Sequence, residues 1–487
     1  MTGPVRAVLG IDLGTSYFKA GLFSEDGRIL ALGRIAVDAE TGVRGRFELS
    51  VPRFQELLRT IIGQALLASG LPSAAIQAVS YSSQANSFLL LDRDARPLSP
   101  IILWQDRRVE EVPPELARLH SRPDYLSVTG LDLIGSLQCP SKLLWFRDQE
   151  PETWGGTRMV MAMSDYLTYL MTGERAGDSG TAPLLGLWDL VQGEWWGEAL
   201  EDLGFDADLF SRLHRPGTVI GKVDRGAAGL FGIPEGIPFA VGSLDHHMAA
   251  IGSGVGSVAS LMESNGTVIA CFAESAAFAP RPGCAMGPGL VAGAPYYNLA
   301  FHDSGAVVLE WYRKRYAESL SFDELTGLAA KVPLGSEGLV CLPLADTCPG
   351  KEGFVAAGPS HGHGHFARAI MESIAGELGI LLEKLRGTDL PDRVIATGGG
   401  AGSDLWLHIM ADLTGCTMVT TGFAECACAG SAMLAAVAAG WFATPAEASA
   451  SWVRTQKTIY PDHGGHGAYA AWYGRYLSLR KTGNTPN

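Results

Sequence analysis

Length, composition and charge exclude several classes of protein. The chain has 487 residues, 47% hydrophobic and 18% charged, which predicts a folded protein of two or more domains and excludes a largely disordered one. The formal net charge is −14, and Lys and Arg are scattered instead of gathered into runs that could follow a phosphate backbone, so we expect no nucleic-acid partner. Because the sequence shows neither an export signal nor a long apolar segment, we expect a cytoplasmic protein without membrane association.

The first part of the chain alternates apolar strands with a helix. Residues 5–14 and 18–37 are apolar runs separated by turn residues, which predicts a strand followed by a hairpin. A helical spacing of apolar residues follows Ser50 and ends at Gly70. Residues 75–92 then return to strand character. A β-sheet covered by at least one helix should therefore open the fold.

A second alternation begins around residues 240–270. The apolar run at 239–245 predicts the opening of a second sheet, and a strand, tight turn and strand follow at 257–274. Such an order is typical of α/β proteins in which helices cover both faces of a parallel sheet. We therefore expect an α/β fold with two domains, residues 1–250 and 251–487.

The first motif with chemistry is DLGTS, which contributes Asp12, Gly14, Thr15 and Ser16, with Lys19 shortly beyond it. Glycine lets backbone N–H groups approach phosphate oxygens, the hydroxyls donate hydrogen bonds, and lysine offsets charge. A neighbouring carboxylate can hold Mg²⁺. A plain hairpin with a polar turn is the alternative reading of this motif.

The second motif, SNGT, sets Gly266 and Thr267 in the turn between two apolar strands. A turn of this composition is common in any hairpin. Its match to the Gly14-Thr15 turn indicates a duplicated domain. We therefore expect this turn to bind the same phosphates from the other domain, so that nucleotide draws the two halves together across a cleft.

The third motif is a glycine-rich connection between a strand and a helix. A strand ending at Thr397 meets the glycines at 398–400, and Ser403 is a helix cap for the segment that follows. Bare backbone leaves room for a flat base and a ribose, and the start of a helix favours nearby negative charge. A tight connection would explain one glycine, whereas three in a row favour a nucleotide site.

The fourth motif places Asp245 directly after an apolar strand and before a helix, in GSLDHH. A carboxylate at a strand end can accept the proton of an attacking hydroxyl group. On local sequence alone, a helix-capping aspartate is an equally good interpretation. The other motifs favour catalysis.

A fifth motif, LWQDRR, places Trp104 and Asp106 after an apolar strand, with Gln84 one hairpin earlier. An aromatic face packs on sugar C–H groups while amide and carboxylate groups hydrogen-bond hydroxyls. These three residues are our candidates for a sugar site. A solvated turn with an exposed ion pair is the alternative.

Two further clusters receive structural interpretations. His361, His363 and His365 are metal-ligand residue types, but no acidic residue or cysteine is interleaved with them, so we expect loop histidines that precede a helix. Cys426 and Cys428 lie in an Ala-rich segment and are predicted to be buried core thiols.

The order DLGTSYFK, WQDRR, GSLDHH, SNGT and TGGGAGSDLW resembles the FGGY carbohydrate kinase family over about nine tenths of the chain. The resemblance implies two ribonuclease H-like domains that close as in actin, with ATP and Mg²⁺ as cofactors and a small sugar or polyol as substrate. It implies Asp245 as catalytic base, and we take Asp12 and Asp245 as the magnesium ligands. The implied nucleotide contacts are Asp12, Gly14, Thr15, Ser16, Lys19, Gly266, Thr267, Gly399, Gly400 and Ser403, and the implied sugar contacts are Gln84, Trp104, Asp106 and Asp245.

Substrate choice follows from smaller differences. Ala85-Asn86 replaces the Arg-Glu pair of glycerol kinases and the Met-His pair of typical xylulose kinases, whereas GSLDHHMAAIGSGVG is closest to the L-fuculose kinase-like branch. We expect a ketose such as L-fuculose or xylulose, or a polyol. His246, His247 and His302 could belong to the substrate pocket, or to a helix start and a surface loop.

Two other functions stay open. An actin-like or Hsp70-like ATPase would share the phosphate turns but would have no use for a polar pocket beside Asp245. A catalytically silent sugar sensor would not need Asp12, Lys19 and Asp245. The oligomeric state also stays open, with a homodimer as one alternative.

Overall fold

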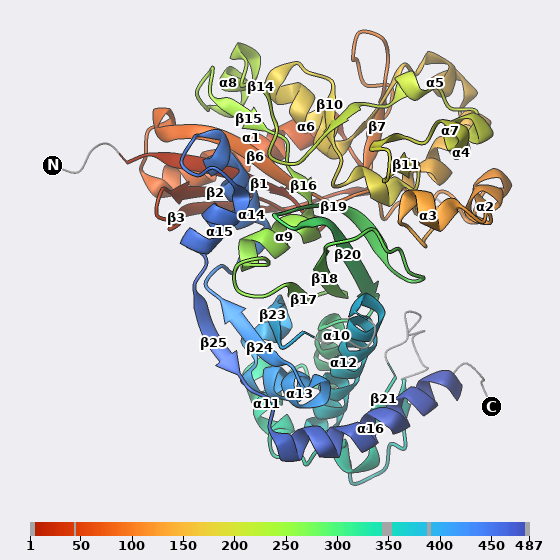
Figure 1. Cartoon of the computed structure of the whole chain (residues 1–487), viewed down its shortest axis with the longest axis vertical. Coiled ribbons are helices and arrows are strands. Elements are labelled where there is room, and N and C mark those ends of the chain that lie inside the picture. Colours follow the sequence, from red (N-terminus) through yellow and green to blue (C-terminus); the bar gives the residue numbers. More distant parts are fainter. Residues whose placement is uncertain (1–4, 43–44, 343–352, 387–390, 483–487) are drawn as a thin grey trace. The chain divides into compact units, whose positions relative to one another are not determined.

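The computed structural model describes residues 5–42, 45–342, 353–386 and 391–482, which form two compact units (Figure 1). Each unit is made of three segments that alternate along the sequence, whereas the sequence analysis expected one boundary after residue 250. Residues 1–4, which belong to the segment in which we expected no export signal, lie outside the described residues. The first unit comprises Met1–Ser257, Glu274–Asn298 and Glu425–Val453, and the second comprises Val258–Ala273, Leu299–Ala424 and Arg454–Asn487.

A mixed sheet organises the first unit. The hairpin β1–β2 and the following strand β3 are antiparallel, and β6 runs parallel to β1. Strand β1 is buried along its whole length, as expected for the centre of a sheet covered on both faces. The order is β14-β15-β6-β1-β2-β3, with β16 also paired to β6; the bounds are β1 Ala7–Leu13, β2 Tyr17–Ser24, β3 Ile29–Ala36, β6 Ile76–Ser83, β14 Val219–Lys222, β15 Pro238–Ala240 and β16 Ser243–Leu244.

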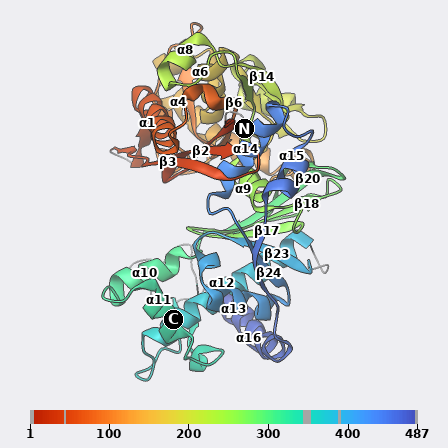
Figure 2. The ribbon, with the colours of Figure 1, turned by 90° about the vertical axis from the view of Figure 1, so that its left-hand side faces the viewer.

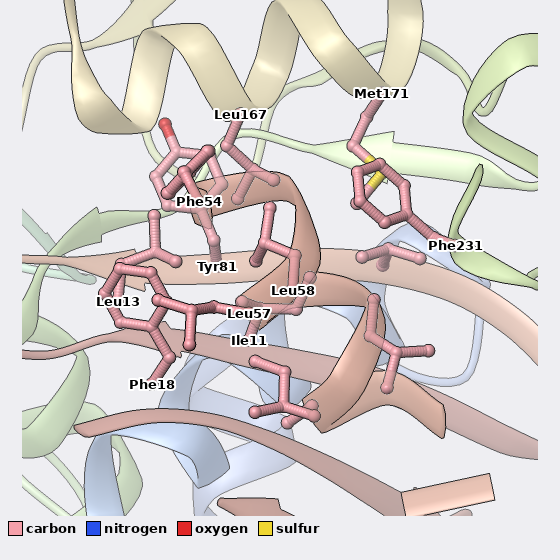
Figure 3. Packing of buried hydrophobic residues seen from close by; sticks show 14 of the residues in the cluster. Ile11, Leu13, Phe18, Phe54, Leu57, Leu58, Tyr81, Leu167, Met171 and Phe231 are labelled. Carbon is pink, nitrogen blue, oxygen red and sulfur yellow. The ribbon is translucent and has the colours of Figure 1, made fainter. Parts of the chain in front are cut away.

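Helix α1 (Val51–Ser69) covers one face of this sheet. It follows Ser50 and ends at Gly70, whose φ of 66° is the left-handed conformation that glycine adopts without strain. Its apolar side chains pack with those of β1, α6 (Met163–Thr172) and α8 (Arg225–Phe231) in one buried cluster (Figure 3). The predicted helix is therefore confirmed.

Helices α9 (Asp245–Ser253) and α14 (Cys426–Ala438) pack on the opposite face of the sheet. Gly10 points toward this face, because successive strand residues alternate between the two faces and its neighbours in β1 face α1. A side chain on Gly10 would place its Cβ 2.4 Å from the carbonyl oxygen of Cys428, and one on Gly430 would lie 1.9 Å from that of Met248. Glycine is needed at both positions for this close approach. Cys428 is fully buried and Cys426 nearly so, which confirms their structural interpretation.

A second mixed sheet organises the second unit. Strands β17 (Leu261–Asn265) and β18 (Ile269–Ser275) form an antiparallel hairpin, and β17 continues in parallel to β23 (Arg393–Thr397). Helices α12 (His363–Arg386) and α13 (Asp404–Thr414) pack beside it (Figure 2). The sheet continues through β24 (Thr417–Thr421) to the antiparallel β25 (Thr455–Ile459).

One predicted boundary was wrong. The apolar run at 239–245 forms β15 and β16, which pair with β6 of the first sheet, so the second sheet begins only at β17. An apolar run has the same pattern in any buried strand, and its pairing partner is a tertiary property. Within the described ranges, no helix is long and apolar enough to cross a membrane.

Other elements complete the two units. The first unit also contains a sheet of order β4-β5-β8-β7-β9, which carries the segment around Trp104. Its strands are β4 Glu40–Thr41, β5 Phe47–Leu49, β7 Phe88–Leu91, β8 Ile101–Ile102 and β9 Met159–Ala162. Further helices are α2 Pro114–His120, α3 Tyr125–Thr129, α4 Cys139–Gln149, α5 Pro151–Gly156, α7 Gly197–Leu203, α10 Val307–Tyr316, α11 Phe322–Ala329, α15 Pro445–Trp452 and α16 His463–Thr482, and further strands are β10 Ala176–Asp178, β11 Trp188–Asp189, β12 Glu194–Trp195, β13 Arg212–His214, β19 Ala285–Val291, β20 Ala294–His302, β21 Val340–Cys341 and β22 Phe354–Val355.

Candidate active site

Three neighbouring parallel strands of the first unit bring polar residues to one edge of the sheet. Asp12 lies near the carboxyl end of β1 and pairs in register with Ser82 of β6. Ser82 also pairs with Ser243 of β16, and Asp245 begins α9 directly after that strand. Carboxyl ends of parallel strands are where open α/β sheets bind their ligands. Asp12 and Asp245 therefore belong to one site.

Asp12 is almost fully buried, at 4% exposure. Burial raises the pKa of its carboxyl group to about 6; Lys19 opposes this shift and the nearby Asp245 adds to it. Its Oδ2 accepts a hydrogen bond from Lys19 Nζ at 3.3 Å, and its Oδ1 accepts one from Ser82 Oγ at 3.0 Å. Two close carboxylates are oxygen donors of the kind that Mg²⁺ prefers, so Asp12 and Asp245 fit the expected metal.

Lys19 has a second partner that the sequence analysis missed. Its Nζ lies 2.7 Å from an oxygen of Glu425, the residue that precedes α14. Burial alone would lower the pKa of Lys19, but Asp12 and Glu425 raise it above its usual range. The lysine therefore stays charged in a half-buried position. Its sequence distance from Glu425 left no local signal for this pair.

The turn of the first hairpin lies beside two of the predicted sugar residues. Trp104 Nε1 donates a hydrogen bond to Thr15 Oγ1 at 3.0 Å, and Thr15 Oγ1 donates one to Gln84 Oε1 at 3.4 Å. Gln84 Nε2 in turn donates to the Gly14 carbonyl oxygen at 3.4 Å. Ser16, the fourth residue of this turn in the prediction, is exposed. The structure thus brings Gln84 and Trp104 together with the Gly14-Thr15 turn.

Asp106 has a different environment. It is fully buried, and hydrogen bonds from Arg108 and the Phe47 N–H overcome the effect of burial and lower the pKa of its carboxyl group. One oxygen lies 2.8 Å from Arg108 Nε and the other 2.7 Å from the Phe47 nitrogen. Both oxygens are therefore engaged in holding the Trp104 loop. A direct contact between Asp106 and a sugar stays a prediction without support from this geometry.

Lys142 of α4 also holds this loop and was not singled out from the sequence. Its Nζ donates hydrogen bonds to the carbonyl oxygens of Leu103 at 3.0 Å and Trp104 at 2.8 Å. The side chain is fully buried, and burial lowers the pKa of its amine to about 8. Among the described residues, no carboxylate lies within ion-pair distance of it. The two carbonyl oxygens accept its hydrogen bonds, and the nearby Asp106 opposes the effect of burial on its pKa.

The predicted residues of the second unit gather around the hairpin β17–β18. The Gly266 carbonyl oxygen accepts a hydrogen bond from the backbone nitrogen of Val307, the first residue of α10. The Thr267 carbonyl oxygen accepts one from the backbone nitrogen of Gly305, just before that helix. Ser403 caps α13 through a hydrogen bond from the Trp406 nitrogen at 3.3 Å. The predicted cap is confirmed, whereas nucleotide contacts at these residues stay a prediction.

Packing explains two of the three consecutive glycines. Gly398 has φ 77° and ψ −170°, and a Cβ there would lie 2.7 Å from the carbonyl oxygen of Asn265. A Cβ on Gly400 would lie 2.3 Å from Asn265 Nδ2, whereas one on Gly399 meets nothing closer than 3.9 Å. The turn therefore needs glycine at 398 and 400 to pack on the hairpin. Gly399 is exposed and is the glycine that packing leaves free to contact a ligand.

His246, His247 and His302 have different surroundings. His247 is buried in α9 and its Nδ1 lies 3.0 Å from Ser243 Oγ; burial lowers the pKa of its ring to about 3. His302 Nδ1 accepts a hydrogen bond from the Ser304 nitrogen at 3.2 Å. His246 is half-buried in the first turn of α9. In the described part of the chain no group of three or more His, Cys, Asp or Glu is arranged to hold a metal ion.

His361, His363 and His365 lie at the start of α12 and each has a partner in the protein. His361 Nδ1 accepts a hydrogen bond from the Gly358 nitrogen and His365 Nδ1 one from the Gly362 nitrogen, while His363 Nδ1 lies 2.9 Å from Tyr312 Oη. His361 precedes α12 as predicted, whereas His363 and His365 lie in its first turn, so the helix begins earlier than the sequence indicated.

Two α/β units, each built on a glycine-threonine hairpin continued by a parallel strand, with paired carboxylates in the first, define a phosphotransferase of the actin-like class. Comparison with known proteins gives the family. Residues 7–252 match the N-terminal domain of the FGGY family of carbohydrate kinases, and residues 346–439 match its C-terminal domain. The chain belongs to the FGGY family of carbohydrate kinases, and it is an ATP-dependent sugar kinase.

Individual relatives agree with this assignment. The chain is 26% identical to a xylulose kinase of Bacillus subtilis, over 94% of this chain and 93% of the relative. It is 27% identical to an L-xylulose/3-keto-L-gulonate kinase of Escherichia coli, over 97% and 96%. The solved structure of xylulose kinase from Rhodospirillum rubrum has a TM-score of 0.86 at 26% identity and covers 98% of this chain and 99% of that one. The predicted pair of actin-like domains is confirmed.

Proposed function

We propose that the chain transfers the γ-phosphoryl group of ATP to a hydroxyl group of a small ketose, with Asp245 as the general base. The observation that carries this proposal is the arrangement of Asp245, Asp12 and Lys19 at the ends of neighbouring strands. A base and a cation next to one another are what a hydroxyl nucleophile and a transferred phosphoryl group require.

The reaction balances with these groups. Asp245 accepts the proton of the substrate hydroxyl group as its oxygen forms a bond to the γ-phosphorus. The bond between the γ-phosphorus and the bridging oxygen of ADP breaks, and ADP leaves with that electron pair. Lys19 offsets the negative charge of the phosphoryl oxygens. Its ion pairs with Asp12 and Glu425 hold it in place for this.

Asp12 and Asp245 would hold Mg²⁺. When bound, the ion neutralises phosphate charge and polarises the phosphoryl oxygens. Lys19 favours the ionised form of the Asp12 carboxyl group and so opposes the effect of burial on its pKa. Ser82 orients that carboxylate through its hydrogen bond to Oδ1.

The substrate class is inferred from the relatives and from the pocket beside Trp104. A ketopentose fits relatives that are named xylulose and L-xylulose kinases, and L-fuculose stays a further candidate. A sugar acid is a second candidate because a cavity of about 460 Å³ is lined by Trp104, Arg46 and Arg107. Arg46 pairs with Glu150 at 3.2 Å. Arg107 is exposed and has no ion pair among the described residues.

The remaining predictions are part of the same proposal. A cytoplasmic location fits a kinase that draws on ATP and free sugars. A homodimer stays an open prediction. The ATPase and sugar-sensor alternatives would require that added sugar does not change ADP formation.

The test is ADP formation by the purified chain with ATP, Mg²⁺ and a panel of ketoses, polyols and sugar acids. Asp245→Asn should lower kcat by at least ~100-fold, with little change in nucleotide affinity, because a general base contributes about that much. Asp224→Asn is the matched control, since Asp224 is an exposed aspartate at the start of α8. Near-normal turnover of Asp245→Asn would refute the role of Asp245, and sugar-independent hydrolysis would refute the kinase proposal.

A further inference from the structure

Trp104 is held rigidly by groups that lie outside the phosphate turn. Its backbone nitrogen donates a hydrogen bond to Ser87 Oγ at 3.0 Å, and its carbonyl oxygen accepts one from Lys142. Ser87 and Lys142 are both almost fully buried. These contacts fix the backbone of Trp104, and its indole group is held by a separate hydrogen bond to Thr15.

The partner of the Trp104 indole is Thr15. An indole N–H can only donate, so Thr15 Oγ1 accepts at this contact. The Gln84 Oε1 atom can only accept, so the single hydroxyl proton of Thr15 points toward Gln84. The amide of Gln84 donates to the Gly14 carbonyl oxygen. Trp104 thus donates to Thr15, Thr15 donates to Gln84, and Gln84 donates to the Gly14 carbonyl oxygen in the turn.

Gln84 is tied to the turn at a further point. Its backbone nitrogen donates a hydrogen bond to the carbonyl oxygen of Leu13 at 3.2 Å. The position of the turn at residues 13–15 therefore depends on the end of β6 and on the Trp104 loop. These are the two places that carry the candidate sugar contacts.

This bonding changes the role expected for Thr15. Phosphate oxygens are acceptors, and a hydroxyl group has one proton to donate. That proton is directed at Gln84. The Thr15 side chain is therefore engaged with the sugar site, and the backbone of the turn and the exposed Ser16 hydroxyl group are what remain for the phosphates.

We propose that Trp104, Thr15 and Gln84 form a hydrogen-bonded relay through which a sugar on Trp104 and Gln84 sets the geometry of the phosphate turn. This inference rests on the proposed function. Thr15 is a positioning residue in it. Since coupling between two sites is reciprocal, sugar should tighten nucleotide binding and nucleotide should tighten sugar binding by the same factor.

The experiment compares Thr15→Val, which keeps the shape and removes the hydroxyl group, with Thr15→Ser, which restores it. Dissociation constants for Mg·ADP are measured with and without the panel sugar of highest kcat/KM. In the wild type, sugar should tighten Mg·ADP binding by ~10-fold, a typical coupling. Thr15→Val should reduce that factor to about 1 without weakening Mg·ADP binding in the absence of sugar. Thr15→Ser should retain most of the factor.

A double-mutant cycle with Trp104→Phe separates a relay from two independent contacts. Phenylalanine keeps an aromatic face and lacks the N–H group. In a relay, the loss of coupling in Thr15→Val/Trp104→Phe equals the loss in either single variant. Additive losses would overturn the proposal. So would weaker Mg·ADP binding by Thr15→Val without sugar, since the hydroxyl group would then be a phosphate ligand.

A second measurement does not depend on catalysis. Exchange of the Trp104 indole N–H with solvent is followed by NMR, with Trp104→Phe used to assign the signal. Thr15→Val should speed this exchange by ~10-fold or more, and Thr15→Ser should leave it near the wild-type rate. Unchanged exchange in Thr15→Val would overturn the relay even in an active enzyme. If no panel sugar stimulates ADP formation by the wild type, the proposed function fails while this measurement still decides the hydrogen bond.

Discussion

The hairpin β1–β2 of the first unit and the hairpin β17–β18 of the second have the same topology and different chemistry. Each is antiparallel, carries a Gly-Thr turn, and continues in parallel into the next strand of its sheet. The cross-strand pair next to the last one before the turn is Asp12 and Lys19 in the first hairpin. In the second it is Ser264 and Ala270.

The difference shows that backbone topology and catalytic charge are separate properties. The first hairpin places a buried carboxylate and a lysine beside Asp245. The second has no charged residue at the equivalent pair and instead packs Asn265 against a glycine turn. A repeated fold therefore supplies two similar backbone turns, and only the first carries a pair of charged residues at this position.

Asp12→Ser should have the largest effect on activity, because it gives the first hairpin the serine that the second hairpin has at the equivalent position. We expect kcat to fall by about 10²–10³-fold, equivalent to about 3–4 kcal/mol, since a preorganised charge at the reacting phosphate is lost. Steady-state kinetics across a range of Mg²⁺ concentrations measures this. Ser264→Ala is the matched control and should change kcat by less than about threefold, so similar losses in both variants would contradict the difference between the hairpins.

Gly398→Ala tests the structural role of the second hairpin. A side chain at this φ and ψ is strained, and its Cβ would meet the Asn265 backbone. We expect the free energy of unfolding to fall by about 2–3 kcal/mol, measured by urea denaturation. Gly399→Ala is the control at the neighbouring glycine and should change it by less than about 0.5 kcal/mol. Equal effects would show that packing on Asn265 does not determine the glycines.

Lys142 gives the smallest and most specific expectation, on the first unit. Burial lowers the pKa of its amine to about 8 from an unfolded value of 10.5. Between these pH values the unfolded chain binds more protons, so the free energy of unfolding rises with pH. The free energy of unfolding of the wild type, minus that of Lys142→Met, should rise by about 1–2 kcal/mol between pH 8 and pH 10.

Urea denaturation at several pH values measures this difference, and the subtraction removes the titration of other groups. Lys222→Met is the matched control for the loss of a lysine, because Lys222 is exposed at the end of β14. If the difference in free energy of unfolding between the wild type and Lys142→Met stays constant with pH, burial does not lower the pKa of the Lys142 amine.

Local patterns predicted much of the fold and the main catalytic candidates. The helix between Ser50 and Gly70 and the cap at Ser403 could be read from a few neighbouring residues, because capping and turn chemistry act over one helical turn. Asp12, Lys19 and Asp245 stand at strand ends that the apolar runs had already marked. Asp106 was harder to interpret, since its sequence neighbour Arg108 and the distant Phe47 nitrogen together take up both its oxygens.

By itself the sequence determined the family, the kinase chemistry and the two glycine-threonine hairpins, because these depend on short-range patterns and on the order of motifs. Only the tertiary structure decided that Glu425 pairs with Lys19, that Lys142 holds the Trp104 loop, and that Thr15 bonds to Gln84. Each of these contacts joins residues far apart in the chain. Their geometry arises from helix and strand packing, which no local pattern specifies.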